Sequence, residues 1–174
     1  MNLKNYLDGN NQPYPVVFIS FPSAKDPSWD KNHPNTSTIE VITVAEFSKH
    51  KKWEDEEWKN RGDEYEAFKE TISQNLLKVL YQKSPETNGH VDYYELSTPL
   101  TSRDLANYKE GELYGINHTP ERFRQKWLKP QTQIKNLYLT GQDIVTAGVS
   151  AALISGVITS SSILKRNLMK QFFN

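Results

Sequence analysis

The sequence contains no cysteine, so disulfide bonds and thiolate metal sites are excluded. Its four histidines lie far apart, without a ligand spacing such as H-x-x-x-H, which argues against a metal site. Positive charge is not in excess, because 21 Lys and Arg balance 21 Asp and Glu. Since binding to nucleic acid depends on a basic surface, a nucleic-acid partner is not expected.

Features of secreted and membrane-spanning proteins are also scarce. Residues 1–15, MNLKNYLDGNNQPYP, lack the apolar core of a secretory signal. Residues 144–164 carry no charge and are long enough to cross a bilayer, but seven are Ser or Thr and two are Gly. We therefore expect a helix buried in protein there, and a membrane anchor is the alternative hypothesis. The expected location is cytoplasmic or peripheral to a membrane.

The basic end of the chain allows two interpretations. Lys165, Arg166 and Lys170 complement the dipole of a final helix. They could equally attach the helix to an anionic membrane surface, aided by four apolar neighbours: Leu168, Met169, Phe172 and Phe173. We favour the first interpretation slightly, and both stay open.

The first half of the chain shows clear periodic patterns. Residues 14–22 and 36–44 are predicted strands, antiparallel because no crossover helix fits between them. In the second strand, Ile39, Val41 and Thr43 share one face. Residues 45–60 are highly charged and predict a solvated helix or loop, anchored by its two tryptophans, Trp53 and Trp58. From Gly62 to about Gln82 apolar residues recur at helical spacing, which predicts an amphipathic helix.

The second half reads less regularly. We expect a strand at 90–99, an irregular stretch at 100–119 and one or two helical turns at 120–130 starting at Pro120. A short strand at 135–141 and one long helix from about Thr146 to the end follow. The fold class is therefore α+β: an antiparallel sheet with a covering helix, then a strand–turn–long-helix unit that resembles the last piece of an α/β domain.

The strand–turn–helix at 136–160 has a specific chemistry. Gly141 allows the backbone to approach a ligand closely, and the N-terminus of the following helix directs free N–H groups to the same place. Asp143 could accept a hydrogen bond from a ligand hydroxyl. Small residues recur along the helix, and we expect their row to lie against another backbone or a ligand: Gly148, Ala152, Gly156 and Ser160. Alternatively, Asp143 only caps a core helix.

The stretch NLYLTGQDIVTAGVSAALISGVITSSSIL resembles the C-terminal flavin-binding segment of FAD-dependent oxidoreductases of the amine oxidase superfamily. Within it, the sequence is most similar to the phytoene desaturase, carotenoid isomerase and all-trans-retinol 13,14-reductase (retinol saturase) family. Further segments agree in the same order, so that the resemblance covers about residues 15–170: FPSAKDPSW, STIEVITV, RGDEYEAFKE, STPLTSRDL and GELYGINHTPERF.

The resemblance implies roles for particular residues. Gly141 and Asp143 would approach the ribityl-pyrophosphate region of FAD, and Gly148 and Val149 would direct backbone N–H groups to the isoalloxazine ring. Residues 1–130 would belong to a substrate domain that holds an apolar polyene, and residues 131–174 to the FAD-binding domain. Tyr114, Ile116 and His118 are expected near the flavin by position. No catalytic residue is assigned, because the flavin itself moves the hydride in such enzymes.

The sequence departs from the family in one respect. None of its eight glycines forms the G-x-G-x-x-G fingerprint through which the family binds the ADP half of FAD. The chain is thus expected to correspond to the C-terminal portion of such an enzyme, with the N-terminal nucleotide-binding half absent. It would be either part of an oxidoreductase that saturates, desaturates or isomerises a polyene, or a non-catalytic fragment or partner subunit that completes a flavin site on another chain.

Overall fold

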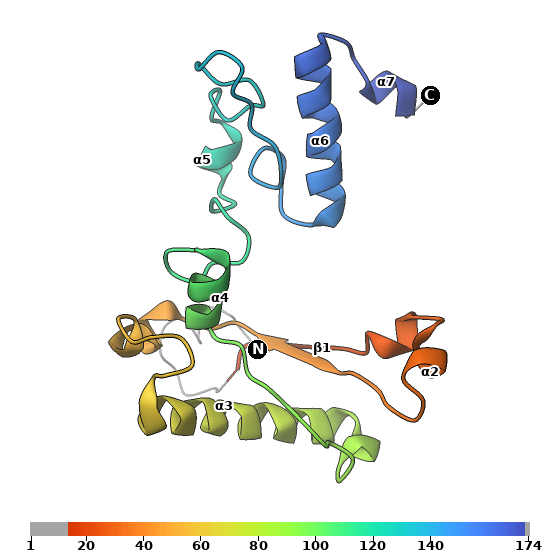
Figure 1. Cartoon of the computed structure of the whole chain (residues 1–174), viewed down its shortest axis with the longest axis vertical. Helices are drawn as coiled ribbons and strands as arrows, with labels where there is room; N and C mark the ends of the chain where they lie inside the picture. The colour runs from red at the N-terminus through yellow and green to blue at the C-terminus, as the bar shows by residue number, and fades with distance from the viewer. Residues whose placement is uncertain (1–13, 173–174) are drawn as a thin grey trace. The chain divides into compact units, whose positions relative to one another are not determined.

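The computed structural model describes residues 14–172, in two compact units that divide after Gly111 (Figure 1). The prediction that residues 1–15 are not a secretory signal falls mostly outside the described part of the chain. Phe173, one of the apolar residues of the predicted membrane contact, also lies outside it. Each unit is treated separately below. The predicted division into a substrate portion and an FAD portion at residue 130 stays a prediction.

The first unit contains a two-stranded antiparallel ribbon of β1 (Val17–Ser20) and β2 (Glu40–Thr43), which confirms the predicted pairing with shorter strands. Phe18 lies opposite Ile42, and both side chains are exposed. The opposite face, with Val41 and Thr43, is half-buried, as the alternating pattern predicts. The link between the strands includes two short helices: η1 (Ser23–Lys25) and α2 (Trp29–Asn32).

Helix α3 (Gly62–Lys83) confirms the predicted amphipathic helix, with its buried residues at helical spacing. Before it, the segment predicted to be a solvated helix or loop is a loop with two 3₁₀ turns: η2 (Phe47–Lys49) and η3 (Lys51–Trp53). Trp53 is 3% exposed and packs on Tyr65, with ring centroids 5.1 Å apart. Trp58, by contrast, is 42% exposed, so the prediction that it anchors this segment is wrong. After α3 comes η4 (Pro85–Thr87).

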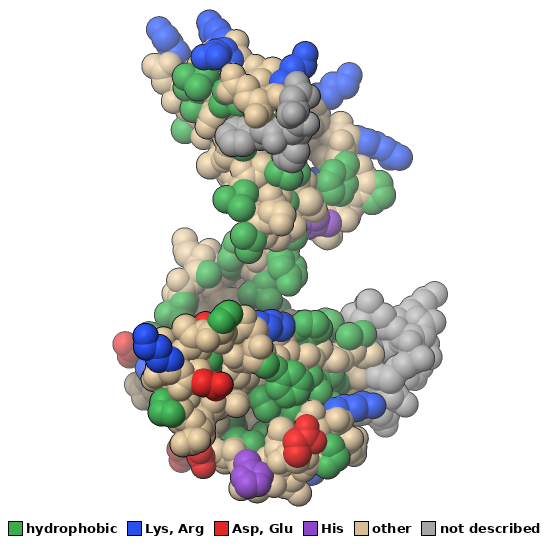
Figure 2. Space-filling model, turned by 90° about the vertical axis from the view of Figure 1, so that its right-hand side faces the viewer, with side chains coloured by type: hydrophobic (Ala, Val, Ile, Leu, Met, Phe, Trp, Pro, Cys, Tyr) green, Lys and Arg blue, Asp and Glu red, His purple; other side chains and the backbone are tan. Residues whose placement is uncertain are grey.

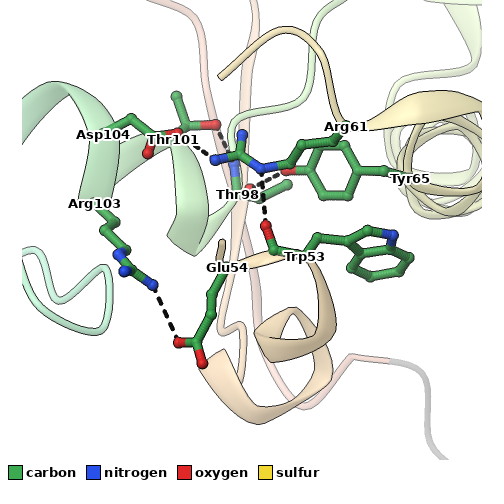
Figure 3. A network of polar contacts seen from close by, with 8 residues as sticks. All are labelled: Trp53, Glu54, Arg61, Tyr65, Thr98, Thr101, Arg103 and Asp104. Carbon is green, nitrogen blue, oxygen red and sulfur yellow. Dashed lines mark hydrogen bonds and ion pairs between the residues drawn. The ribbon is translucent and has the colours of Figure 1, made fainter. Parts of the chain in front are cut away.

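Polar contacts hold the core of the first unit together (Figure 3). The buried Arg61 donates to Asp104 at 2.6 Å and to the carbonyl of Trp53 at 3.2 Å. The Tyr65 hydroxyl lies 2.7 Å from the Thr98 hydroxyl. Because each buried polar group here has a partner, the network costs little to bury and fixes how the segments meet.

For the middle of the chain, one prediction is wrong and a second is wrong in part. Residues 91–98 pair with no strand in the described part of the chain, so the strand predicted at 90–99 does not form. Helix α4 (Pro99–Ala106) occupies the start of the stretch predicted to be irregular, and residues 107–119 form neither helix nor strand, as predicted. Pro99 suits the first helical position, and Thr98 and Thr101 form a reciprocal capping box. Both signals are present in the sequence.

The second unit contains α5 (Pro120–Phe123), α6 (Val149–Leu164) and α7 (Met169–Phe172). The helical turn starting at Pro120 is confirmed. The strand predicted at 135–141 is reduced to a single bridge between Gln131 and Tyr138. The predicted single long helix is also wrong, because α6 ends at Lys165 in a left-handed conformation. Among residues 14–172, no helix has both the length and the apolar character to cross a membrane.

The fold class is α+β, with a two-stranded antiparallel ribbon and several helices. The sequence is neutral as a whole, but its two units carry opposite net charges. From residue 112 onward, eight Lys and Arg oppose three Asp and Glu, which leaves a net charge of +5, and the preceding residues carry 13 against 18, or −5. Figure 2 shows Lys and Arg side chains gathered over the C-terminal unit.

Candidate functional site

The turn between Thr140 and α6 is built on two glycines. Gly141 has φ +99° and Gly148 has φ +107°, conformations that residues with a Cβ rarely adopt. A Cβ at either position would meet nothing within 4 Å, so packing does not require glycine there. The two glycines therefore set the path of the backbone and leave open space beside it.

Helix α6 binds the segment that enters this turn. The Ser155 hydroxyl accepts from the Gly141 N–H at 2.8 Å, and the Thr159 hydroxyl donates to the Leu139 carbonyl at 2.9 Å. Ser155 is fully buried. Since the extended segment finds hydrogen-bond partners on the helix, it needs little pairing with another strand.

The buried row of α6 consists of Ala151, Ser155 and Thr159, four residues apart. It is not the row of small residues predicted to lie against another backbone. That row includes Gly148, Ala152 and Ser160, which are exposed, and Gly156, where a Cβ would meet nothing within 4 Å. No contact of this row within the described chain fulfils the prediction.

A second segment, residues 115–123, packs on the turn. The Ile116 N–H donates to Asp143 Oδ1 at 2.9 Å, and the Ala147 N–H donates to His118 Nε2 at 2.8 Å. A Cβ at Gly115 would overlap Asp143 Oδ1, so glycine is required for this approach. Ile116 and His118 thus lie on the turn that carries Asp143. Their predicted place beside a flavin stays a prediction.

The buried side chain of Arg122 binds the same segment to the turn. It is 5% exposed, and its Nη2 donates to the carbonyls of Gln142 and Asp143 at 3.0 and 2.9 Å. Its backbone N–H is bound by the Thr119 hydroxyl, the N-cap of α5. Sequence reasoning missed Arg122, because a single arginine in the charged stretch ERFRQK carries no pattern.

The N-terminus of α6 remains available to a ligand. No side chain caps it at Gly148, and Val149 is 80% exposed. His118 accepts the hydrogen bond of the Ala147 N–H, and Ala147 precedes the helix. Gly141 and Asp143 are half-buried, and one carboxylate oxygen of Asp143 accepts the Ile116 N–H. The four predicted residues therefore surround one turn that offers N–H donors, a positive helix end and a carboxylate.

Such a turn fits an electron-rich planar or anionic group. Positive helix termini stabilise negative charge, and an open glycine lets a ring or phosphate approach the backbone. The donor set is compatible with the isoalloxazine ring of a flavin.

Comparison with known proteins gives a consistent result. The chain is 34% identical to an all-trans-retinol 13,14-reductase of Danio rerio over 99% of its own length and 30% of that protein. It is 38% identical to an all-trans-retinol 13,14-reductase of Rattus norvegicus over 88% of its length and 26% of that protein. An inactive all-trans-retinol 13,14-reductase of Danio rerio is 32% identical over 88% of the chain.

The chain spans between 26% and 30% of the length of these curated relatives. No protein-family model matches it. No solved structure matches it either.

Proposed function

Because the chain belongs to the family of the all-trans-retinol 13,14-reductases, we propose that it forms part of an oxidoreductase acting on a retinoid or another conjugated polyene. The observation that carries the proposal is the similarity over nearly the whole chain to proteins of that name. The remaining length of those relatives would supply the nucleotide-binding half, whose G-x-G-x-x-G fingerprint the chain lacks.

The turn at residues 141–149 is the proposed FAD contact of this chain. Gly141 and Gly148 give the cofactor room beside the backbone, and Val149 with its neighbours presents N–H groups at the positive end of α6. Asp143 would accept a hydrogen bond from a hydroxyl of the ribityl chain with the carboxylate oxygen that Ile116 leaves free. A bound flavin supplies the hydride chemistry. The chain's own residues orient it and favour negative charge on its ring.

Substitution of Val149 by Asp tests this contact. A carboxylate in the first turn stabilises an α-helix by about 0.3–1 kcal/mol, so α6 should become slightly more stable. The same charge repels an electron-rich ligand, so flavin absorbance should be lost from the complex of this chain with its missing half. Ser160→Asp, near the other end of α6 and also exposed, is the matched control and should keep the flavin. Equal flavin content in the two variants would refute the proposed contact.

A second candidate function has its own support. An inactive reductase is also similar to this chain, so the similarity does not by itself carry activity. The chain could instead be a non-catalytic subunit that completes a flavin site on another protein. Reconstitution separates the two: flavin binding with polyene turnover supports the enzyme, and flavin binding without turnover of retinoid or carotenoid substrates supports the non-catalytic subunit.

A further inference from the structure

Arg122 is a buried cation without a counter-ion. Its side chain is enclosed, and its Nε and Nη1 atoms have no hydrogen-bond partner. Among residues 14–172, the acceptors that its side chain meets are the backbone carbonyls of Gln142 and Asp143, both bound by Nη2. None of the ion pairs found among residues 14–172 includes Arg122.

The other buried arginine, Arg61, is paired with a carboxylate, as buried charges usually are. Arg61 binds the carboxylate of Asp104 at 2.6 Å and also donates to a carbonyl. A buried charge left without an opposite charge is strongly destabilising, because desolvation is not compensated. Two unsatisfied guanidinium nitrogens add the cost of lost hydrogen bonds. The arrangement around Arg122 is therefore incomplete without an anionic acceptor.

Within the described residues of the second unit, no carboxylate supplies that acceptor. Nε and Nη1 of Arg122 have no hydrogen-bond partner, and Arg122 belongs to none of the ion pairs there. The Asp143 carboxylate instead accepts the Ile116 N–H, and Glu121 lies 3.9 Å from Arg124. The unit carries a net charge of +5, and the uncapped positive end of α6 follows the same turn. Its electrostatic field thus favours an external anion.

We propose that Arg122 is an anion-binding residue, which receives a phosphate or carboxylate group on Nε and Nη1 beside the Gln142–Asp143 turn. Phe123 forms the movable cover of this site. Its ring centroid lies 5.3 Å from the guanidinium carbon and 6.2 Å from that of the His118 ring, and the residue is 61% exposed, so its displacement would break few contacts. The site uses atoms of Arg122 that the proposed flavin contact does not involve. The anion-binding proposal can therefore be tested independently of that contact.

The direct test follows the Nε–H resonance of Arg122 by ¹⁵N NMR in the whole chain. Sodium pyrophosphate and sodium acetate are titrated separately at constant ionic strength. A saturable shift of this resonance, absent from exposed Arg124, is the expected result. Saturation by pyrophosphate alone identifies a phosphate-bearing ligand, and saturation by both probes identifies a carboxylate as a competent partner. A resonance that moves with neither probe, or moves linearly without saturation, overturns the proposal.

Variants extend the test through the backbone amides of residues 142 and 143. Arg122→Met should abolish their saturable response, whereas Arg124→Met, two residues away and exposed, should retain it. Phe123→Ala should retain binding with faster exchange. Protection of the Gly141 amide from hydrogen exchange verifies that the Arg122→Met variant is folded. If the variant does not fold, the titration of the wild-type chain still tests the proposal. An unchanged response in a folded Arg122→Met contradicts the proposal. Loss of flavin binding with the pyrophosphate response intact would refute only the proposed function.

Discussion

Gly115 offers the sharpest test of how the turn is held. Its φ is +66°, and an added Cβ would overlap Asp143 Oδ1 and lie 2.9 Å from Asp143 Cγ. Gly115→Ala therefore forces the carboxylate away from the Ile116 N–H, to which it is bound at 2.9 Å. The substitution changes one methyl group but should disturb both the backbone and this hydrogen bond.

The magnitude has two parts. A left-handed conformation costs alanine about 1–2 kcal/mol. Loss of a hydrogen bond to a charged carboxylate costs about 1.5–3 kcal/mol more. Gly141→Ala, in the same unit, is the control: its φ is +99° and its Cβ would meet nothing within 4 Å. The control should carry only the backbone cost, so the two variants should differ by about 1.5–3 kcal/mol.

Hydrogen exchange of the second unit measures this difference. In Gly115→Ala the Ile116 amide should exchange roughly 10–100 times faster than in Gly141→Ala, since each 1.4 kcal/mol is a factor of ten. Chemical denaturation gives the accompanying free energy of unfolding. If Gly115→Ala is no more destabilising than the control, and Ile116 keeps its protection, the contact with Asp143 does not hold the turn.

Three further predictions concern single buried groups. Ser155→Ala leaves the Gly141 N–H without its acceptor and should cost about 1–3 kcal/mol, measured by urea denaturation; an unchanged midpoint would contradict this. Burial lowers the pKa of His50 below its ordinary 6.5, so only the unfolded state takes up a proton as the pH falls through 6.5, and stability should decrease from pH 7.5 to 5. His50→Gln should weaken this pH dependence of the urea midpoint, whereas His90→Gln, at an exposed position, should not. Leu100→Ala, at a fully buried core position, should cost about 2–5 kcal/mol in thermal unfolding, and a loss below 1 kcal/mol would show that this core is not tightly packed.

The elements that could be predicted are those whose buried apolar residues recur at a regular spacing in the sequence. Helix α3 and the β1–β2 ribbon have alternating or helical apolar patterns that match the faces they bury. Residues 91–98 have strand-like composition, but composition does not provide a neighbouring strand. The end of α6 at Lys165 has neither glycine nor proline to mark it, so the sequence pattern predicts a continuous helix.

The candidate site was predictable only in part, for a related reason. The Gly141-x-Asp143 turn has a recognisable residue pattern, and Ser155 and Thr159 show the spacing of one helix face. Arg122 binds backbone carbonyls, which every residue possesses. The residue types around Arg122 therefore do not indicate its role, which becomes visible only in the structure.

The separation of charge between the units bears on how the molecule behaves in solution. With a net charge of −5 before residue 112 and +5 from residue 112 onward, the chain is neutral near pH 7 but consists of two oppositely charged units. At low ionic strength, the negative unit of one copy should attract the positive unit of another, because no net charge keeps the copies apart. Added electrolyte shortens the range of that attraction, so the chain should dissolve better in moderate salt than in dilute buffer.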